Sequence, residues 1–238
     1  MLVSHQHRFI FIHVPKTAGR SLRTGLKPYA QNVHDYWLNR WVHRCGGRCN
    51  VIAPTKHRWL RSHTTAKRAR CYYPRQLYEQ YWKFAFVRNP WDWLVSYYHF
   101  VTSHPNHRNH QKLSALGSFE NYIRTIAVKP KFQQKDFVTD RQGKLIVNFI
   151  GRFETLQQSV STINEQLGIQ IDIGNKRNTS RHRDYRTYYD SELIRIVQER
   201  YRPDIEFFGY QFDGMQFDGI RQGTSLGENA PSQPGRAA

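Results

Sequence analysis

The stretch Phe9-Ile-Phe-Ile-His-Val-Pro-Lys-Thr-Ala-Gly-Arg-Ser-Leu22 is typical of a buried strand, a short turn and the start of a helix. The apolar run Phe9–Val14 predicts the strand, and Pro15 ends it because proline brings no N–H to a sheet. A cation, two hydroxyls and small residues follow in Lys16–Ser21, before a helix expected over Ser21–Leu26. Free N–H groups and the dipole at a helix N-terminus attract phosphate-like groups. The stretch therefore predicts an anion site.

This turn differs from the Walker loop of kinases and GTPases, in which a glycine precedes the lysine. Here Lys16 comes before Gly19, the only glycine of the stretch. A nucleotide phosphotransferase would also need a metal-holding carboxylate nearby, and the nearest acidic residue, Asp35, lies in no recognisable motif. An ordinary strand–helix turn with a surface lysine stays open as the alternative at this point.

Composition points to a polyanionic partner. The 238 residues include 36 Lys and Arg against 18 Asp and Glu, a formal net charge of +18. Nucleic acid, an acidic glycan, an anionic membrane or a phosphorylated cofactor would each suit that charge. Because no nucleic-acid motif appears and the basic residues are dispersed, we expect no nucleic acid partner. A non-enzymatic module that binds nucleic acid or heparin remains the alternative function.

The length suits one domain with a tail, which we place at residues 1–220 and 221–238. The tail is rich in Gly, Ser, Pro and Ala and is expected to be disordered. No apolar stretch before the first strand is long enough for a signal peptide or a membrane span. If Met1 is the native start, we expect a cytoplasmic protein; a trimmed chain would allow the Golgi lumen.

Metal binding is not expected. The odd number of cysteines, Cys45, Cys49 and Cys71, makes a poor disulfide framework, and Cys45-Gly-Gly-Arg-Cys49 lacks a second ligand pair. A group of four histidines follows a predicted helix and is interpreted as a surface loop: His99, His104, His107 and His110.

A second strand–helix junction lies at Phe84–Ser96. Phe84–Val87 predicts a short buried strand, Asn89 is a good N-cap and Pro90 suits the first helical position. Arg88 then lies at the carboxyl end of a strand, where open α/β sheets bind ligands. With the Ser96 hydroxyl on the same helix, its guanidinium could hold a second phosphate. A plain salt bridge is the alternative role for Arg88.

Further elements are predicted by the same local patterns. We expect a helix over Pro74–Trp82 and another from Glu154 to a C-terminal Gly168. A third helix should run from a capping Asp190 to Tyr201 and stop before Pro203. Leu145–Gly151 predicts another core strand. The basic loop at residues 175–183 is either a solvated charge run or a cap over a ligand.

With both junctions in view, the sequence resembles the carbohydrate-type sulfotransferases, especially the family of the heparan and chondroitin 2-O- and 4-O-sulfotransferases and their bacterial relatives. Phe11–Leu22 is similar to that family's loop for the 5′-phosphosulfate, and Val87–Ser96 to its 3′-phosphate motif. Ile150–Glu154 and Asp204–Phe212 are also similar to family signatures. Together these motifs span most of the chain up to about residue 212.

The resemblance implies a single-domain α/β fold with a P-loop-like, doubly wound parallel sheet flanked by helices. It implies 3′-phosphoadenosine 5′-phosphosulfate (PAPS) as cofactor and a carbohydrate or other hydroxyl-bearing acceptor, for which an acidic saccharide would suit the charge. The matching positions imply these cofactor-binding residues: Lys16, Thr17, Ala18, Gly19, Arg20, Ser21, Leu22, Arg88 and Ser96. Arg20 departs from the family pattern, which usually has threonine there, so one hydroxyl contact is replaced by a cation.

A mechanism follows from where charge develops. The acceptor hydroxyl attacks sulfur in line while a phosphate oxygen leaves, so a cation belongs at the leaving group and a base at the attacking oxygen. Lys16 fits the first role. A histidine fits the second, and His63-Thr-Thr-Ala66 is similar to the family's histidine segment, so we predict His63 as the base with His57 as the alternative. No metal is needed.

Overall fold

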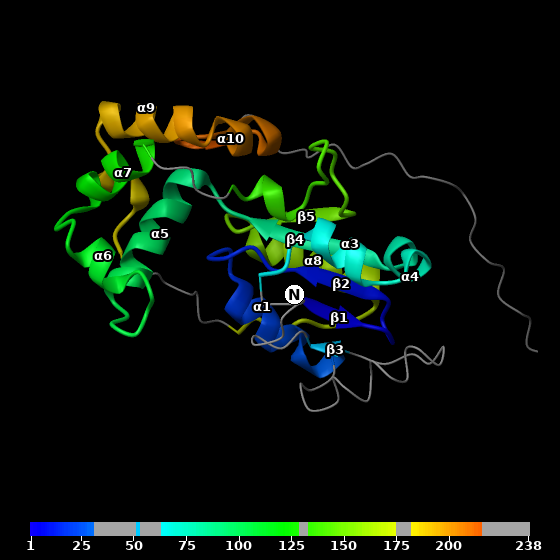
Figure 1. The fold of residues 1–238 in the computed structure, drawn as a ribbon. Coiled ribbons are helices and arrows are strands. Elements are labelled where there is room, and N and C mark those ends of the chain that lie inside the picture. Colours follow the sequence, from blue (N-terminus) through cyan, green and yellow to red (C-terminus); the bar gives the residue numbers. More distant parts are fainter. Residues whose placement is uncertain (31–50, 53–62, 129–132, 175–181, 216–238) are drawn as a thin grey trace, which may run out of the picture.

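Strands β2 and β4, which end at the two predicted anion sites, lie at the centre of the sheet in this computed structural model. The structure describes residues 1–30, 51–52, 63–128, 133–174 and 182–215. Its five-stranded sheet has the order β3-β1-β2-β4-β5 and is flanked by helices (Figure 1). The strands are β1 (Leu2–Ser4), β2 (Phe9–Ile12), β3 (Val51–Ile52), β4 (Trp82–Val87) and β5 (Phe149–Arg152).

The helices connect these strands and form a second group beyond the end of β4 (Figure 1). The α-helices are α1 (Gly19–Leu26), α3 (Ala66–Tyr72), α4 (Arg75–Gln80), α5 (Pro90–Thr102), α6 (His110–Ser114), α7 (Phe119–Val128), α8 (Leu156–Leu167), α9 (Ser191–Arg200) and α10 (Arg202–Phe208). Short 3₁₀ turns are η1 (Lys27–Tyr29), η3 (Lys135–Phe137) and η4 (Tyr185–Tyr188), and a small hairpin pairs β6 (Tyr210–Gln211) with β7 (Gly214–Met215).

The predicted α/β class is confirmed, but the sheet is mixed rather than wholly parallel. Strands β2, β4 and β5 are parallel, whereas β1 pairs antiparallel with both β2 and β3. Only residues 5–8 separate β1 from β2, and such a short connection allows a hairpin but no crossover. Strand β1 was not predicted, because a three-residue strand leaves almost no periodic pattern in the sequence.

Most predicted elements appear with shifted ends. The strand expected at Leu145–Gly151 begins only at Phe149, because Leu145 instead forms an isolated bridge with Thr139. Asp190 caps α9 by accepting a hydrogen bond from the Leu193 N–H, as predicted. Helix α9 ends at Arg200, before Pro203, as predicted, but Pro203 also belongs to the next helix. It lies in the first turn of α10, where its missing N–H has no consequence.

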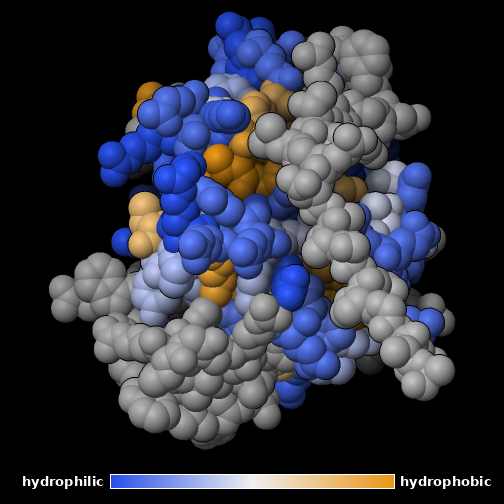
Figure 2. Space-filling view, turned by 90° about the vertical axis from the view of Figure 1, so that its right-hand side faces the viewer, coloured by the Kyte–Doolittle hydropathy of each residue, from blue (hydrophilic) through white to orange (hydrophobic). Residues whose placement is uncertain are grey.

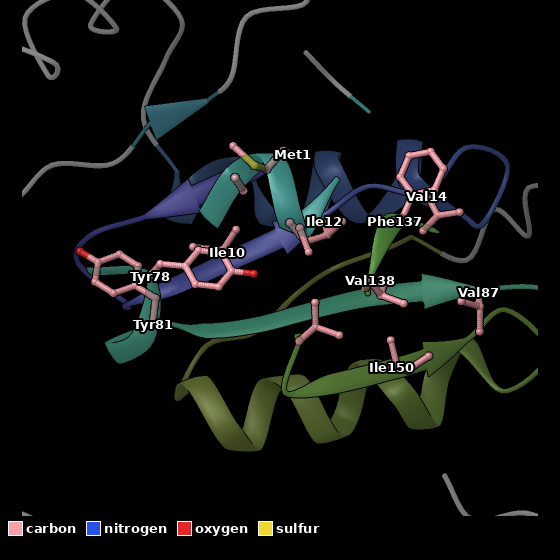
Figure 3. Close-up of a cluster of buried hydrophobic side chains, with 14 of the residues drawn as sticks. Met1, Ile10, Ile12, Val14, Tyr78, Tyr81, Val87, Phe137, Val138 and Ile150 are labelled. Carbon is pink, nitrogen blue, oxygen red and sulfur yellow. The ribbon is translucent and has the colours of Figure 1, made fainter. Parts of the chain in front are cut away.

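Alternating side chains of the strands supply two cores, one on each face of the sheet. Ile10, Ile12, Ala85 and Val87 pack toward α3 and α4 (Figure 3). Their neighbours in the same strands pack toward α1 and α8 on the other face: Phe9, Phe11, Phe84 and Phe86. A third apolar cluster joins α5, α7 and α9. The sheet is therefore buried on both faces, which gives the ends of β2 and β4 a rigid frame.

Polar residues cover most of the described surface in the view of Figure 2, where apolar residues appear as small separate patches. Within the described part of the chain, no helix has the length and apolar character needed to cross a bilayer. Several predicted features lie outside the described residues: His57, Cys45, Cys49, residues 175–181 of the basic loop, and the tail at 221–238.

Candidate functional site

The loop between β2 and α1 has the backbone shape of an anion site. Lys16 and Ala18 have φ values of 64° and 60°, in the left-handed region that non-glycine residues seldom adopt. The helix begins at Gly19, two residues before the predicted start, and no side chain caps it at the N-cap residue Ala18. The first turn of α1 therefore directs backbone N–H groups toward a ligand position rather than toward a side-chain cap.

Two hydrogen bonds hold this loop in place from inside. The buried Thr17 hydroxyl donates to the Val14 carbonyl oxygen at 2.9 Å. The indole N–H of Trp93, on α5, donates to the Pro15 carbonyl oxygen at 2.7 Å. The loop is thus shaped before any ligand arrives, and Thr17 contributes to that shape through its own hydroxyl proton.

Lys16 carries a positive charge that lacks a carboxylate partner among the described residues. Its Nζ lies 4.2 Å from the centroid of the Phe100 ring. Burial, together with the charges of Arg88 and Arg20, lowers the pKa of Lys16 to about 8. Crowded cations in a partly buried site favour an anion, whose charge would relieve their repulsion.

The remaining loop residues differ in exposure. Arg20 is exposed, Ser21 is half-buried, and Leu22 is fully buried in the core beside α8. Leu22 can therefore offer a ligand only its backbone. The Arg20 side chain is free to reach outward from the first turn of α1.

His13 packs directly against Gly19. A Cβ atom at Gly19 would lie 1.7 Å from His13 Nε2, so only glycine fits there. The His13 ring is buried and its Nδ1 has no hydrogen-bond partner. Burial keeps the pKa of His13 well below its usual range, with the nearby charge of His63 acting in the same direction. The ring is therefore neutral and apolar in effect at neutral pH.

His63 lies beside this pair. Its Nδ1 is 3.1 Å from the His13 carbonyl oxygen, and the two imidazole centroids are 4.4 Å apart. Because a carbonyl can only accept, the hydrogen bond assigns the proton to Nδ1 and leaves the Nε2 lone pair available. The side chain is open to solvent, yet partial burial of the ring lowers the pKa of His63. His63 thus has the protonation state of a base at neutral pH.

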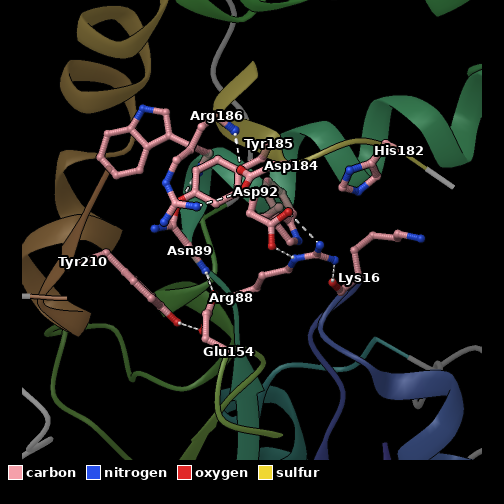
Figure 4. Close-up of polar contacts among 12 residues, drawn as sticks. Lys16, Arg88, Asn89, Asp92, Glu154, His182, Asp184, Tyr185, Arg186 and Tyr210 are labelled. Atoms are coloured by element: carbon pink, nitrogen blue, oxygen red, sulfur yellow. Dashed lines mark hydrogen bonds and ion pairs between the residues drawn. The ribbon is translucent and has the colours of Figure 1, made fainter. Parts of the chain in front are cut away.

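Arg88 lies in the salt bridge that the sequence analysis kept as its alternative. Its Nε and Nη2 donate to the two carboxylate oxygens of Asp92 at 2.6 and 2.7 Å, and its guanidinium lies 3.9 Å from the Phe153 ring centroid (Figure 4). Nη1 points the other way, 3.4 Å from the Lys16 carbonyl oxygen. Asp92 therefore occupies one edge of the guanidinium, and the other edge faces the Lys16 loop.

The backbone at this junction is held by side chains from distant segments. Asn89 caps α5 by accepting from the Trp91 N–H at 3.0 Å, as predicted. Its own N–H donates to Glu154 at 2.6 Å, and its side-chain amide donates to the Gln211 carbonyl oxygen at 2.8 Å. Burial raises the pKa of Glu154, whose other oxygen accepts from the Tyr210 hydroxyl (Figure 4).

The structure thus brings Lys16 next to Arg88 and places His63 against the Gly19 side of the same loop. Ser96 is buried on α5, one helical turn beyond Asp92. Four further residues of this region were not predicted from the sequence: His13, Asp92, Phe100 and Gln134. Asp92 carried a signal, because it follows Arg88 by four residues, a spacing that allows a local salt bridge. The other contacts join residues far apart in the chain.

Among the described residues, no group of three or more His, Cys, Asp or Glu side chains could hold a metal ion. Of the four clustered histidines, His99 lies on α5 and His110 begins α6. His99 instead stacks on the ring of His182 at 5.4 Å.

Comparison with known proteins gives this geometry a family. A sequence model described as "Sulfotransferase family" matches residues 1–211. The chain belongs to the sulfotransferase family. A mouse sulfotransferase, SULT7A1, crystallised in complex with PAP, has a similar fold, with a TM-score of 0.52 and 11% identity over 85% of this chain and 86% of that one. An uncharacterized protein of Archaeoglobus fulgidus is 25% identical over 113 residues, which cover 47% of this sulfotransferase and 88% of the archaeal protein.

Proposed function

We propose that this sulfotransferase takes a sulfuryl group from PAPS and transfers it to a hydroxyl of a carbohydrate acceptor. The observation that carries the proposal is the loop between β2 and α1. It combines an uncapped helix N-terminus with Lys16, a partly buried cation whose pKa is lowered by burial and by its cationic neighbours. The complex of mouse SULT7A1 with PAP supports the choice of nucleotide.

The described residues fit both ends of such a cofactor. Lys16, Arg20 and the backbone N–H groups at the start of α1 would hold the 5′-phosphosulfate. The edge of Arg88 that faces the Lys16 loop and the hydroxyl of Ser96 would hold the 3′-phosphate. The contact between Arg88 Nη1 and the Lys16 carbonyl oxygen supports this division, because it brings the two positions within the reach of one nucleotide.

PAPS would supply an activated sulfuryl group on a phosphate leaving group. Lys16 Nζ would stabilise the negative charge that grows on the bridging oxygen as the S–O bond breaks. His63 Nε2 would accept the proton of the acceptor hydroxyl as that oxygen attacks sulfur from the opposite side. Its lowered pKa keeps it neutral, and its Nδ1 bond to the His13 carbonyl keeps the ring oriented. An acidic saccharide would suit the net charge of +18.

Transfer of labelled sulfate from PAPS, together with thermal stabilisation by nucleotides, tests the proposal. We expect adenosine 3′,5′-bisphosphate (PAP) to raise the melting temperature more than ATP does, because a ligand that binds only the native state stabilises it. Lys16→Ala and His63→Ala should abolish transfer without unfolding the protein. Lys27→Ala, which removes an exposed lysine at the end of α1, is the matched control and should leave transfer unchanged.

Three outcomes would overturn parts of the proposal. Full transfer by His63→Ala would remove His63 as the base, and loss of transfer in His57→Ala would then support the alternative. Stabilisation by ATP alone would point to phosphotransfer. Binding of heparin or DNA with a steep salt dependence and no response to PAP would favour the polyanion-binding module.

A further inference from the structure

The side chain of Gln134 takes both backbone hydrogen-bonding groups of Arg88. Gln134 Oε1 accepts from the Arg88 N–H at 2.9 Å, and Gln134 Nε2 donates to the Arg88 carbonyl oxygen at 2.7 Å. Gln134 is completely buried and lies between α7 and β5. It is 46 residues from Arg88 in the chain. The backbone on both sides of the Arg88 Cα atom is therefore held by one side-chain amide.

Gln134 is itself fixed by Asp204, a fully buried residue of α10. The two carboxylate oxygens of Asp204 accept from the backbone N–H groups of Gln134 and Lys135, each at 2.8 Å. A chain of short hydrogen bonds thus runs from α10 to the end of β4. Gln134 and Asp204 are both buried polar side chains, and burying such side chains is costly unless their polar groups are hydrogen-bonded.

We propose that Gln134, held by Asp204, is a positioning residue for the guanidinium that binds the 3′-phosphate. This inference rests on the proposed function of Arg88. The side chain of Arg88 is long, so a small tilt of its peptide is amplified at the guanidinium, and a misplacement of about 1 Å is enough to weaken a preorganised site. Asp92 fixes one edge of the guanidinium, and Gln134 fixes the peptide at the other end of the side chain.

Selectivity for the 3′-phosphate separates this role from a merely structural one. The test measures, by calorimetry, the affinities of wild type, Gln134→Met and the matched control Gln133→Met for PAP and for adenosine 5′-monophosphate, which lacks the 3′-phosphate. In Gln134→Met we expect the affinity for PAP to fall about tenfold or more and that for the monophosphate to change less than about threefold. Gln133→Met should bind both ligands as wild type does.

A double-mutant cycle with Arg88→Lys completes the experiment. Arg88→Lys keeps a cation for Asp92 but removes the guanidinium fork, so adding Gln134→Met to it should cause little further loss of PAP affinity. Equal losses from Gln134→Met in both backgrounds would overturn the inference, as would equal losses for the two ligands.

Gln134→Glu keeps an acceptor for the Arg88 N–H and provides a variant if Gln134→Met does not fold. It should show a smaller loss of PAP selectivity, and wild-type selectivity in this variant would also overturn the inference. Failure of the proposed function looks different: wild type would then bind PAP no more tightly than the monophosphate, or Arg88→Lys would bind PAP as wild type does.

Discussion

Replacing Gly19 by alanine is expected to disturb the anion loop through His13. The added Cβ would lie 1.7 Å from His13 Nε2, 2.1 Å from Cδ2 and 2.7 Å from Cε1. The ring has little room to withdraw, because Phe11 stacks on it with a centroid distance of 5.8 Å and His63 lies at 4.4 Å. Overpacking of this kind costs about 1–3 kcal/mol, and we expect Gly19→Ala to lower the free energy of unfolding by that amount.

The same substitution should have the opposite sign when the ring is absent. In a His13→Ala background the Cβ at residue 19 meets no imidazole, and alanine is favoured over glycine in a helix by about 0.5–1 kcal/mol. The two substitutions should therefore couple by about 1.5–4 kcal/mol. Urea unfolding of wild type, Gly19→Ala, His13→Ala and the double variant measures this coupling.

The loop carries Lys16, so the affinity of Gly19→Ala for PAP should also fall, by about tenfold for a loss of about 1.4 kcal/mol. Recovery of PAP binding in the double variant is not required, because His13→Ala also removes the ring that packs against the loop. Equal destabilisation by Gly19→Ala in both backgrounds would show that the contact with His13 is not the cause.

Two further predictions concern pH. The value of kcat/KM should fall at acid pH as His63 is protonated, with a midpoint below 6.5 because the pKa of His63 is lowered. It should also fall at alkaline pH as Lys16 loses its charge near its pKa of about 8. A profile still rising past pH 9 would contradict the role of Lys16. Burial raises the pKa of Asp204 from 3.8 to about 6, so the native state holds this proton more tightly. Its contribution to stability is present below pH 4 and lost as pH rises to about 6, and Asp204→Asn should remove up to about 3 kcal/mol of that pH dependence in urea titrations at pH 4 and 7. An unchanged difference between wild type and variant at the two pH values would contradict it.

The two strand–helix junctions could be predicted because their signals are local. The aromatic and β-branched runs of β2 and β4, the cap at Asn89 and the glycine after α8 each act within a few residues along the chain. The antiparallel strand β1 could not be predicted, because three residues are too few to show the alternation of a strand. The place of Pro203 in the first turn of α10 could not be predicted either, because proline suits the start of a helix as well as the position after its end.

The site was predicted as a set of residue types rather than as an arrangement. Lys16 and Arg88 stand at strand ends, and parallel strands bring their ends to the same edge of a sheet, so their proximity could be expected. A salt bridge of Arg88 could be predicted only as an alternative to phosphate binding, and the sequence did not indicate that it would be a bidentate bond to Asp92. The bonds of Gln134 to Arg88 and the contact of His13 with Gly19 had no signal in any motif.

The sequence by itself determined the α/β class, the strand–turn–helix junction around Lys16, the capped helix after Arg88 and the strongly basic charge. These properties depend on periodicity, capping and composition, which act over short distances along the chain. Only the tertiary structure decided that one edge of Arg88 belongs to Asp92 while its peptide belongs to Gln134, and that His63 rests on His13. Those contacts join residues up to tens of positions apart, and their geometry follows from how the helices pack on the sheet.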